Sequence, residues 1–249
     1  MKLTDDKSAA ILSHLAQGTE YTFSALEKTG INSKSLSIRL QLLREKKLIN
    51  KDGRNYIISD KGRILLQSMK HLRSILEPSF PDYTNLKSKI PNDSLRFALA
   101  RYVYLLIEFY KKKLDCVLLF GSVAKGTMTD TSDIDLLIIV KDWNISLWDR
   151  TAELLSIRRF MRTTPEYKAL QVHQKPFRVQ HIPFSRKEAL KSHAIYPDLL
   201  VDHIILYQND NKANNLLKWI RAKCEKIGLR KVTKLDKTTY WITTGGNPW

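Results

Sequence analysis

"LLFGSVAKGTMTDTSDIDLLIIV", residues 118–140, is the stretch that decides the fold and the chemistry. Two apolar segments suited to buried strands flank a polar segment rich in small residues. Gly121 and Ser122 follow the first segment, and Asp133 and Asp135 stand at the start of the second. Two nearby carboxylates repel each other and lose hydration unless a cation or a hydrogen-bond donor compensates them. The stretch therefore predicts a binding site at the end of a buried sheet.

The two aspartates are candidate metal ligands. Side chains alternate along a strand, so Asp133 and Asp135 should project from one face, with their backbones about 7 Å apart, while Ile134 points into the core. Mg²⁺, or Mn²⁺ in its place, binds oxygen ligands and combines few carboxylates with water and substrate phosphates. The pair therefore predicts a divalent cation shared with a nucleoside triphosphate.

Gly121 and Ser122 are candidate nucleotide-binding residues. They end a buried strand and begin a helix, where backbone N–H groups and a hydroxyl can donate to phosphate oxygens. A glycine permits the close approach that a Cβ would obstruct.

The spacing of Gly-Ser, ten intervening residues and Asp-x-Asp resembles the motif of the polymerase β-like nucleotidyltransferases, notably their minimal bacterial and archaeal members. The resemblance extends from about residue 95 to 185, and the remainder looks like an archaeal elaboration. It implies an α/β domain with a mixed sheet. In such a domain Asp133 and Asp135 would be the catalytic metal ligands, and Gly121 and Ser122 would bind the triphosphate.

One residue departs from that pattern. The family usually carries a third carboxylate on a later strand, as metal ligand and base, but the segment "FRVQHIPFS" has Gln180 at the position we align with it. A neutral amide cannot accept the proton. Alternation points the neighbouring His181 to the other face. Asp198 and Asp202 are further candidates if their segment folds back over the site, although capping or surface roles suit both better.

The N-terminal part has a different pattern. Apolar spacing predicts helices at residues 5–17, 22–30 and 31–49, followed by a hairpin with a turn at Asp52-Gly53 and a helix at 60–76. In the third helix Leu36, Leu40 and Leu43 should face inward. This order resembles the winged helix-turn-helix domains of archaeal and bacterial regulators, over residues 5–77.

In winged-helix domains the third helix enters the major groove and the wing contacts the backbone or minor groove. The resemblance implies that nucleic acid would be contacted by Ser33, Lys34, Ser35, Ser37, Arg39 and Arg54. The alternative is that such a domain only forms dimers or docks onto its neighbour.

We expect an α+β chain of three parts. A winged-helix domain over 1–77 is followed by a linker over 78–94, where prolines and polar turn formers cluster. A nucleotidyltransferase domain with a basic C-terminal elaboration then covers 95–249.

The charge of the chain favours a polyanionic partner. Forty-two Lys plus Arg against 25 Asp plus Glu give +17 and a pI near 9.8. Cys116 and Cys224 are the two cysteines, too few for a disulfide framework or a cysteine-based zinc site, so a reducing cytoplasm is expected. The sequence contains no apolar run of roughly 18 residues, so a membrane location is not expected.

Residues 203–249 are also basic, with 9 Lys plus Arg against 3 Asp plus Glu, and they contain Trp219, Tyr240, Trp241 and Trp249. Two interpretations stand side by side. Basic residues beside aromatic rings can follow a phosphate backbone and stack on bases. Alternatively, Trp219 packs in the core with the leucines beside it.

The resemblance to the nucleotidyltransferases implies a Mg²⁺-dependent enzyme that would transfer a nucleoside monophosphate from a triphosphate to an acceptor hydroxyl. The acceptor would be nucleic acid, RNA included, or a protein, and the winged helix would bind DNA; a homodimer is a further option. The competing hypothesis, which Gln180 favours, is a non-enzymatic DNA-binding regulator whose nucleotidyltransferase-like domain is degenerate.

Overall fold

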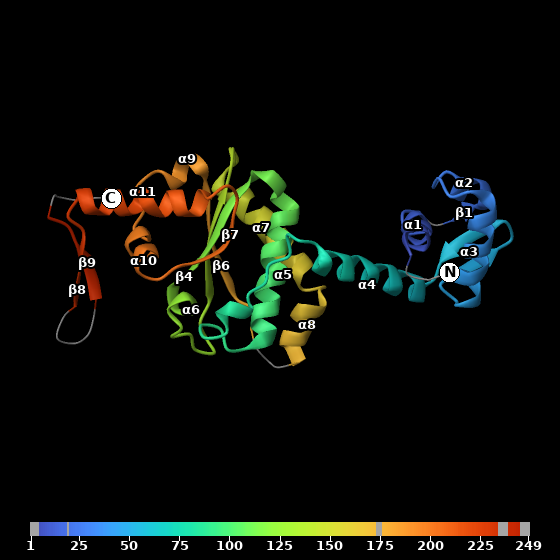
Figure 1. Cartoon of the computed structure of the whole chain (residues 1–249), viewed down its shortest axis with the longest axis horizontal. Coiled ribbons are helices and arrows are strands. Elements are labelled where there is room, and N and C mark those ends of the chain that lie inside the picture. Colours follow the sequence, from blue (N-terminus) through green and yellow to red (C-terminus); the bar gives the residue numbers. More distant parts are fainter. Residues whose placement is uncertain (1–4, 19, 173–175, 234–238, 245–249) are drawn as a thin grey trace. The chain divides into compact units, whose positions relative to one another are not determined.

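The structure is a computed structural model that describes residues 5–18, 20–172, 176–233 and 239–244. The chain divides into two compact units, Met1–Pro78 and Ser79–Trp249 (Figure 1). Each unit has its own hydrophobic core.

The first unit combines helices with a small antiparallel sheet of strand order β1-β3-β2. Its elements are α1 (Asp6–Leu15), β1 (Tyr21–Thr22), α2 (Phe23–Glu27), α3 (Ser33–Glu45), β2 (Ile49–Asp52), β3 (Asn55–Ile58) and α4 (Asp60–Leu76). The helices and the hairpin expected from the sequence are present, and β1 adds a short third strand that the pattern did not indicate.

Local signals explain these boundaries. The side chains of four residues before helices accept hydrogen bonds from backbone N–H groups and so cap α1 to α4: Asp5, Thr22, Asn32 and Ser59. Leu36, Leu40 and Leu43 of α3 are buried, as predicted. Gly53 has a φ of 54°, which the tight hairpin turn between β2 and β3 requires.

The second unit is built on a mixed four-stranded sheet of order β6-β5-β4-β7. Strand β5 runs parallel to β6, whereas β4 is antiparallel to β5 and β7. The elements in chain order are η1 (Thr84–Leu86), α5 (Asp93–Tyr110), η2 (Lys111–Lys113), β4 (Leu114–Phe120), α6 (Gly121–Lys125), β5 (Ile134–Val140), α7 (Leu147–Met161), α8 (Pro165–Val172), β6 (Val179–Ser185), α9 (Arg186–Ala189), α10 (Tyr196–Val201), β7 (Ile204–Gln208), α11 (Lys212–Lys226), β8 (Arg230–Thr233) and β9 (Thr239–Ile242). The expected α+β class with a mixed sheet is confirmed.

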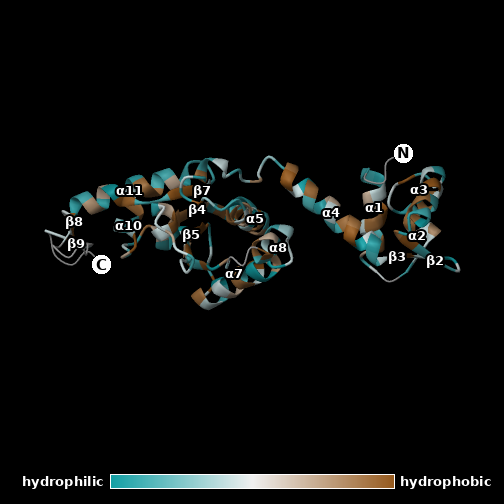
Figure 2. Ribbon diagram, turned by 90° about the horizontal axis from the view of Figure 1, so that it is seen from below, coloured by the Kyte–Doolittle hydropathy of each residue, from teal (hydrophilic) through white to brown (hydrophobic). Residues whose placement is uncertain are grey.

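Helices cover both faces of this sheet. Leu136 and Ile138 of β5 pack in one core with α5, α7 and α8, and Leu137 and Ile139 pack in the other with α10 and α11. Figure 2 shows apolar residues along the strands between these two helical layers. Because both faces are buried, β4 and β5 are almost continuously apolar rather than alternating.

The segment expected to be a linker, residues 78–94, differs from that expectation. Tyr83, Leu86 and Ile90 are buried in the core of the second unit, and the Tyr83 hydroxyl donates to the Leu206 carbonyl at 2.8 Å. The prolines and polar residues that suggested a linker give this segment its irregular backbone. The apolar side chains between them fix residues 79–94 to the second unit.

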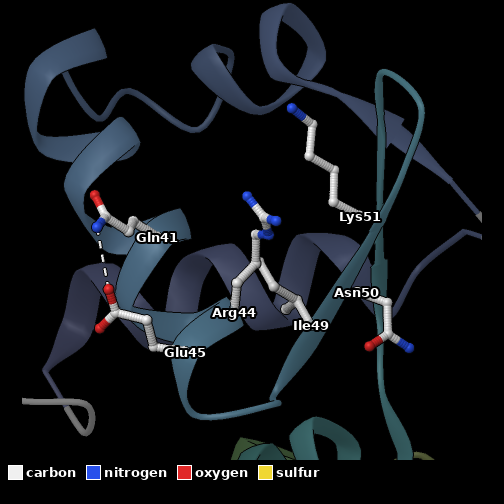
Figure 3. A pocket seen from close by; sticks show the side chains of 6 residues that line it. All are labelled: Gln41, Arg44, Glu45, Ile49, Asn50 and Lys51. Atoms are coloured by element: carbon white, nitrogen blue, oxygen red, sulfur yellow. Dashed lines mark hydrogen bonds between the residues drawn. The ribbon is translucent and has the colours of Figure 1, made fainter.

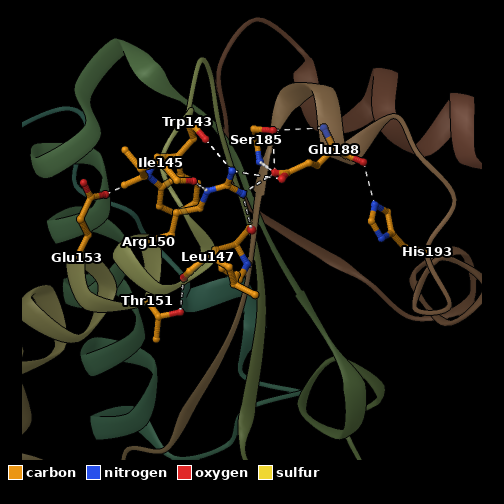
Figure 4. Close-up of polar contacts among 10 residues, drawn as sticks. Trp143, Ile145, Leu147, Arg150, Thr151, Glu153, Ser185, Glu188 and His193 are labelled. Carbon is orange, nitrogen blue, oxygen red and sulfur yellow. Dashed lines mark hydrogen bonds and ion pairs between the residues drawn. The ribbon is translucent and has the colours of Figure 1, made fainter.

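A buried arginine joins α7 to the ends of two strands (Figure 4). The Arg150 guanidinium donates to the carbonyls of Trp143 at 2.7 Å and Ile145 at 3.1 Å, and it is ion-paired with Glu188. Glu188 also accepts hydrogen bonds from Ser185 in a capping box at the start of α9. A charged pair therefore connects α7 to the end of β6.

Two expectations concern the cell environment of the chain. Cys116 and Cys224 are both buried and not joined to each other. Over the residues that the structure covers, the helices are all too short or too polar to cross a membrane.

Candidate functional site

The end of the sheet brings the predicted residues together. The register pairs Phe120 at the end of β4 with Asp135 in β5, and Asp135 with Gln180 in β6. Directly paired residues of neighbouring strands project from the same face. Gly121 and Ser122 follow Phe120 at once, so the Gly-Ser turn, Asp135 and Gln180 lie in one row across three strands.

Gly121 occupies a position that excludes other residues. Its φ is 72°, and an ideal Cβ built on it would overlap the Oδ2 atom of Asp135. Only glycine satisfies both the backbone conformation and the close approach. Helix α6 therefore begins directly beside the carboxylate.

The segment between the two motifs is held by its own backbone. Gly126 ends α6 in the left-handed conformation, and the N–H of Thr127 donates to the Ser122 carbonyl at 3.0 Å. The Thr129 N–H donates to the Ser132 hydroxyl at 2.8 Å. This compact turn positions Asp133 directly before the start of β5.

The electrostatics of the carboxylate pair favour a cation. Burial, followed by the nearby charge of Asp133, raises the pKa of Asp135 above its ordinary value. Within the described part of the chain, neither carboxylate accepts a hydrogen bond or forms an ion pair with the protein. The same holds for the Ser122 hydroxyl, which has no protein partner among the described residues.

The donor set fits Mg²⁺ that is shared with a substrate rather than fully caged by protein. Mg²⁺ takes one or two carboxylates together with water and phosphate oxygens. Among the described residues, no group of three or more His, Cys, Asp or Glu side chains could hold a metal alone. Asp133 and Asp135 would therefore be its protein ligands, with the remaining positions left for water and a triphosphate.

The structure places Gln180 beside Asp135, at the position where the third acid was expected. His181 faces the opposite side of β6 and hydrogen-bonds the Tyr102 hydroxyl at 2.7 Å. Burial, assisted by Arg158, lowers the pKa of His181 to about 4. His181 is thus a neutral packing residue with no access to the carboxylates.

The two remaining acid candidates lie elsewhere. Asp198 is in α10, where its carboxylate accepts a hydrogen bond from the Trp241 indole at 3.3 Å. Asp202 is the C-cap residue that follows α10. Neither belongs to a described metal-ligand cluster with Asp133 and Asp135.

Arg178 is a further cation at this edge of the sheet, and the motifs did not indicate it. Ile134 pairs with Val179, so Arg178 stands one step before this pair and on the same face of the sheet as Gln180. Its guanidinium donates to the Thr131 carbonyl at 3.3 Å, and it is exposed beside the turn that precedes Asp133. The signal was available, because an arginine two residues before Gln180 shares its face of the strand.

The residues predicted to contact nucleic acid lie in α3 and in the turn between β2 and β3. Lys34, Ser37 and Arg54 are exposed, and the Ser33 hydroxyl donates to Glu27. Arg39, expected among the nucleic-acid contacts, is not exposed on the surface. Arg39 is 9% exposed, ion-paired with Asp5 at 2.6 Å and hydrogen-bonded to Ser35 at 2.7 Å. The capping residue of α1 therefore draws it into the unit.

A polar surface cleft of about 660 Å³ lies between the C-terminal part of α3 and strand β2 (Figure 3). It is lined by Gln41, Arg44, Glu45, Ile49, Asn50 and Lys51. In Figure 3 the Gln41 amide donates to the Glu45 carboxylate, at 3.0 Å, while Arg44 and Lys51 make no drawn contact. These two cations extend the basic surface of the unit beyond the residues expected from the sequence.

Comparison with known proteins agrees with this geometry. Residues 106–196 match the protein-family model described as "Polymerase beta, Nucleotidyltransferase". This part of the chain is a polymerase β-like nucleotidyltransferase domain, as the motif predicted. The matched range contains both motifs, α7, α8 and β6. No curated protein matches the chain.

Two solved structures are similar to part of the chain. One is a toxin-antitoxin crystallised with AMP-PNP, with 16% identity and a TM-score of 0.34; the match covers 51% of this chain and 86% of the other. The second is a candidate nucleotidyltransferase from Sulfolobus solfataricus, with 21% identity and a TM-score of 0.28, covering 48% of this chain and 91% of the other.

Proposed function

We propose that the second unit transfers a nucleoside monophosphate from a nucleoside triphosphate to an acceptor hydroxyl and releases pyrophosphate. The observation that carries the proposal is the contact between Gly121 and Asp135. It sets the Gly-Ser turn, where a triphosphate can bind, against a carboxylate that burial and Asp133 make costly to ionise without a cation.

Each residue of the site has a proposed role. The Ser122 hydroxyl and the backbone N–H groups of the turn donate to phosphate oxygens, and the Arg178 guanidinium supplies positive charge next to them. Asp133 and Asp135 hold Mg²⁺. When bound, this cation neutralises the developing charge on the triphosphate.

Gln180 limits what the protein itself can do with the acceptor proton. The amide can accept a hydrogen bond from the acceptor hydroxyl and orient it, but it does not take up the proton at neutral pH. Phosphoryl-type transfer depends mainly on positioning and charge stabilisation, so the site would support a slow reaction.

The first unit would bring the enzyme to nucleic acid. We propose that it is a winged helix of the archaeal and bacterial type, with α3 as recognition helix and the turn at Gly53 as wing. Lys34, Ser37 and Arg54, which are exposed, are its proposed contacts, whereas the Arg39 ion pair must open before that side chain could reach a groove.

The test is transfer of label from each of the four α-labelled nucleoside triphosphates, with Mg²⁺, to total RNA and to a lysate. The double variant Asp133→Asn plus Asp135→Asn should abolish transfer. A matched control, Asp142→Asn plus Asp210→Asn, removes the same charge from exposed positions of the same unit and should retain it. Both control positions have positive φ, which asparagine tolerates. Equal transfer by both double variants would refute the assigned site.

A second candidate function is favoured by Gln180. Without a third acid, the second unit could sense a nucleotide while the first unit regulates transcription. Duplex DNA binding that is independent of Mg²⁺, together with no transfer from any of the four nucleotides, would support this regulator.

A further inference from the structure

Seven cations gather at the C-terminal end of the second unit. We define the C-terminal basic surface by Lys212, Lys218, Arg221, Lys223, Lys226, Arg230 and Lys231. Between residues 211 and 233 the sole acidic residue is Glu225. Among the described residues, none of the seven cations forms an ion pair.

Five of these cations belong to α11, and its exposed ones lie away from the core side of the helix. Leu217, Ile220 and Cys224 are buried against the sheet. Lys218 and Arg221 are exposed on the opposite side. A helix that needed only to pack would not require an outer face so nearly free of acids.

Aromatic rings lie among the cations. On α11 the Lys223 ammonium lies 5.0 Å from the centre of the Trp219 ring, which packs partly into the core. In the hairpin Lys231 pairs with Trp241, and its ammonium lies 6.0 Å from that ring. Tyr240 is 43% exposed.

The hairpin is fixed relative to α11 and α10. Gly228, with a φ of 61°, turns the chain from α11 into β8, and an added Cβ there would overlap the Thr244 side chain. The Trp241 indole donates to Asp198 in α10 at 3.3 Å. Figures 1 and 2 both show the hairpin at the end of α11 that lies away from the sheet.

We propose that this C-terminal basic surface binds single-stranded nucleic acid and so presents the acceptor. Cations neutralise successive phosphates, and exposed rings stack on bases irrespective of sequence. The binding itself stands on the surface alone, whereas the role as acceptor rests on the proposed transfer function.

Other polyanions fit the surface less well. A lipid surface would need apolar side chains to insert, but of the described residues 211–233 and 239–244 the one exposed large apolar side chain is Tyr240. An acidic protein would pair with the cations, but it would have no use for the aromatic rings between them. A single-stranded nucleic acid uses both, because phosphates and bases alternate along its strand.

The test is fluorescence anisotropy of the full chain with a labelled uridine oligonucleotide of about 20 nucleotides, without triphosphate or metal. The variant Lys218→Glu, Arg221→Glu and Arg230→Glu should lose about tenfold or more in affinity. Its salt dependence should weaken by about two units of slope, because each phosphate contact to a single strand contributes about 0.7. Tyr240→Ala should weaken binding severalfold with an unchanged salt slope.

A matched control distinguishes binding at this particular surface from a general effect of the net charge. Lys111→Glu, Lys112→Glu and Lys113→Glu makes the same change of charge at three exposed lysines of the same unit. It should keep affinity within about twofold of the parent. Equal loss in the two triple variants, or competition by polyglutamate as strong as by the oligonucleotide, would overturn the proposal.

Failure of this binding proposal and failure of the proposed transfer function would give different results. Asp133→Asn plus Asp135→Asn should bind the oligonucleotide as the parent does. Binding without transfer would leave this surface standing and refute the enzyme, whereas transfer to a lysate protein with no oligonucleotide binding would do the reverse.

Discussion

Gly121 and Asp135 approach so closely that no side chain fits between them, since a Cβ on Gly121 would overlap the Asp135 carboxylate. The two residues belong to adjacent strand ends, because Phe120 pairs with Asp135 in the sheet register. This contact couples the first motif to the second, and it makes the glycine a requirement of the site and not only of the turn.

We therefore predict that Gly121→Ala abolishes nucleotide transfer. The substitution adds strain at a positive φ, on the order of 1–2 kcal/mol, and displaces Asp135 as well. Label transfer and thermal unfolding of the variant would be measured together.

Gly30→Ala is the matched control for that variant. Gly30 has a φ of 76°, close to the 72° of Gly121, and its Cβ would meet no atom within 4 Å. It should show a similar loss of stability with transfer retained. If Gly121→Ala transferred label at the parent's rate, the contact would have no role in the site.

The carboxylate pair should make the metal-free protein less stable as pH rises. Because burial and Asp133 raise the pKa of Asp135, its folded state holds a proton that the unfolded chain has released. This contribution to stability is present below the ordinary Asp pKa of 3.8 and is lost as pH rises through the higher folded pKa.

Asp135→Asn should consequently raise the melting temperature at pH 7 without metal, with a smaller difference near pH 4. Mn²⁺ or Mg²⁺ should stabilise the parent and not this variant. Thermal melts at both pH values, with and without metal, check this. Identical melting temperatures for parent and variant at pH 7 would show that the pair carries no electrostatic cost.

The sheet and its site could be predicted because their signals are local. The apolar segments of β4 and β5, the glycine at 121 and the alternation that places Asp133 and Asp135 together are all visible within 23 residues, 118–140. Gln180 was placed beside Asp135 by the family resemblance, and the parallel register of β5 and β6 agrees.

The structure differs from the sequence-based expectations where residues far apart in the chain make contact. Nothing local shows that Asp5 caps α1 and also draws Arg39 inward across 34 positions. Similarly, Tyr83 lies among prolines and turn formers, yet it is buried in the core of the second unit and donates a hydrogen bond to Leu206, 123 positions away. Such pairings depend on topology that the spacing of residues does not encode.

The Arg150–Glu188 pair should contribute stability that acid removes. The hydrogen bond from Arg150 holds the pKa of Glu188 at about 2, below its ordinary 4.5. The contribution is fully present above pH 4.5 and is lost as pH falls toward 2. Solvent screens this carboxylate, which is 36% exposed, so we expect on the order of 1 kcal/mol.

Glu188→Gln should lower the free energy of unfolding at pH 7 by that amount and have little effect near pH 2, as measured by urea unfolding. Arg150→Met should cost more, about 3 kcal/mol, because it leaves a carboxylate and three carbonyls, that of Pro183 included, without their donor. A Glu188→Gln effect of equal size at both pH values would show that packing, not the ion pair, is responsible.

Arg178 should govern affinity for the triphosphate and not the transfer step. Arg178→Ala is expected to raise the KM for nucleotide about tenfold, since a charge-assisted contact to phosphate is lost, while Arg178→Lys should recover part of it. Initial rates against nucleotide concentration separate the two parameters. A change in kcat with unchanged KM would place this side chain at the reacting atoms instead.

Restoring an acid at position 180 tests whether the row of three strands is a catalytic centre. In Gln180→Glu a third carboxylate would stand next to Asp135, so the metal-free protein should be less stable and Mn²⁺ should bind more tightly. The new group can also accept the proton of the acceptor hydroxyl, so transfer should be faster by about tenfold or more.

His181→Gln, one residue away but on the opposite face of β6, is the control and should leave metal affinity unchanged. Calorimetric titration with Mn²⁺ and single-turnover label transfer measure the two effects separately. If Gln180→Glu bound metal no better than the parent, position 180 would not face the cation. Position 180 would then not correspond to the third acid of the family.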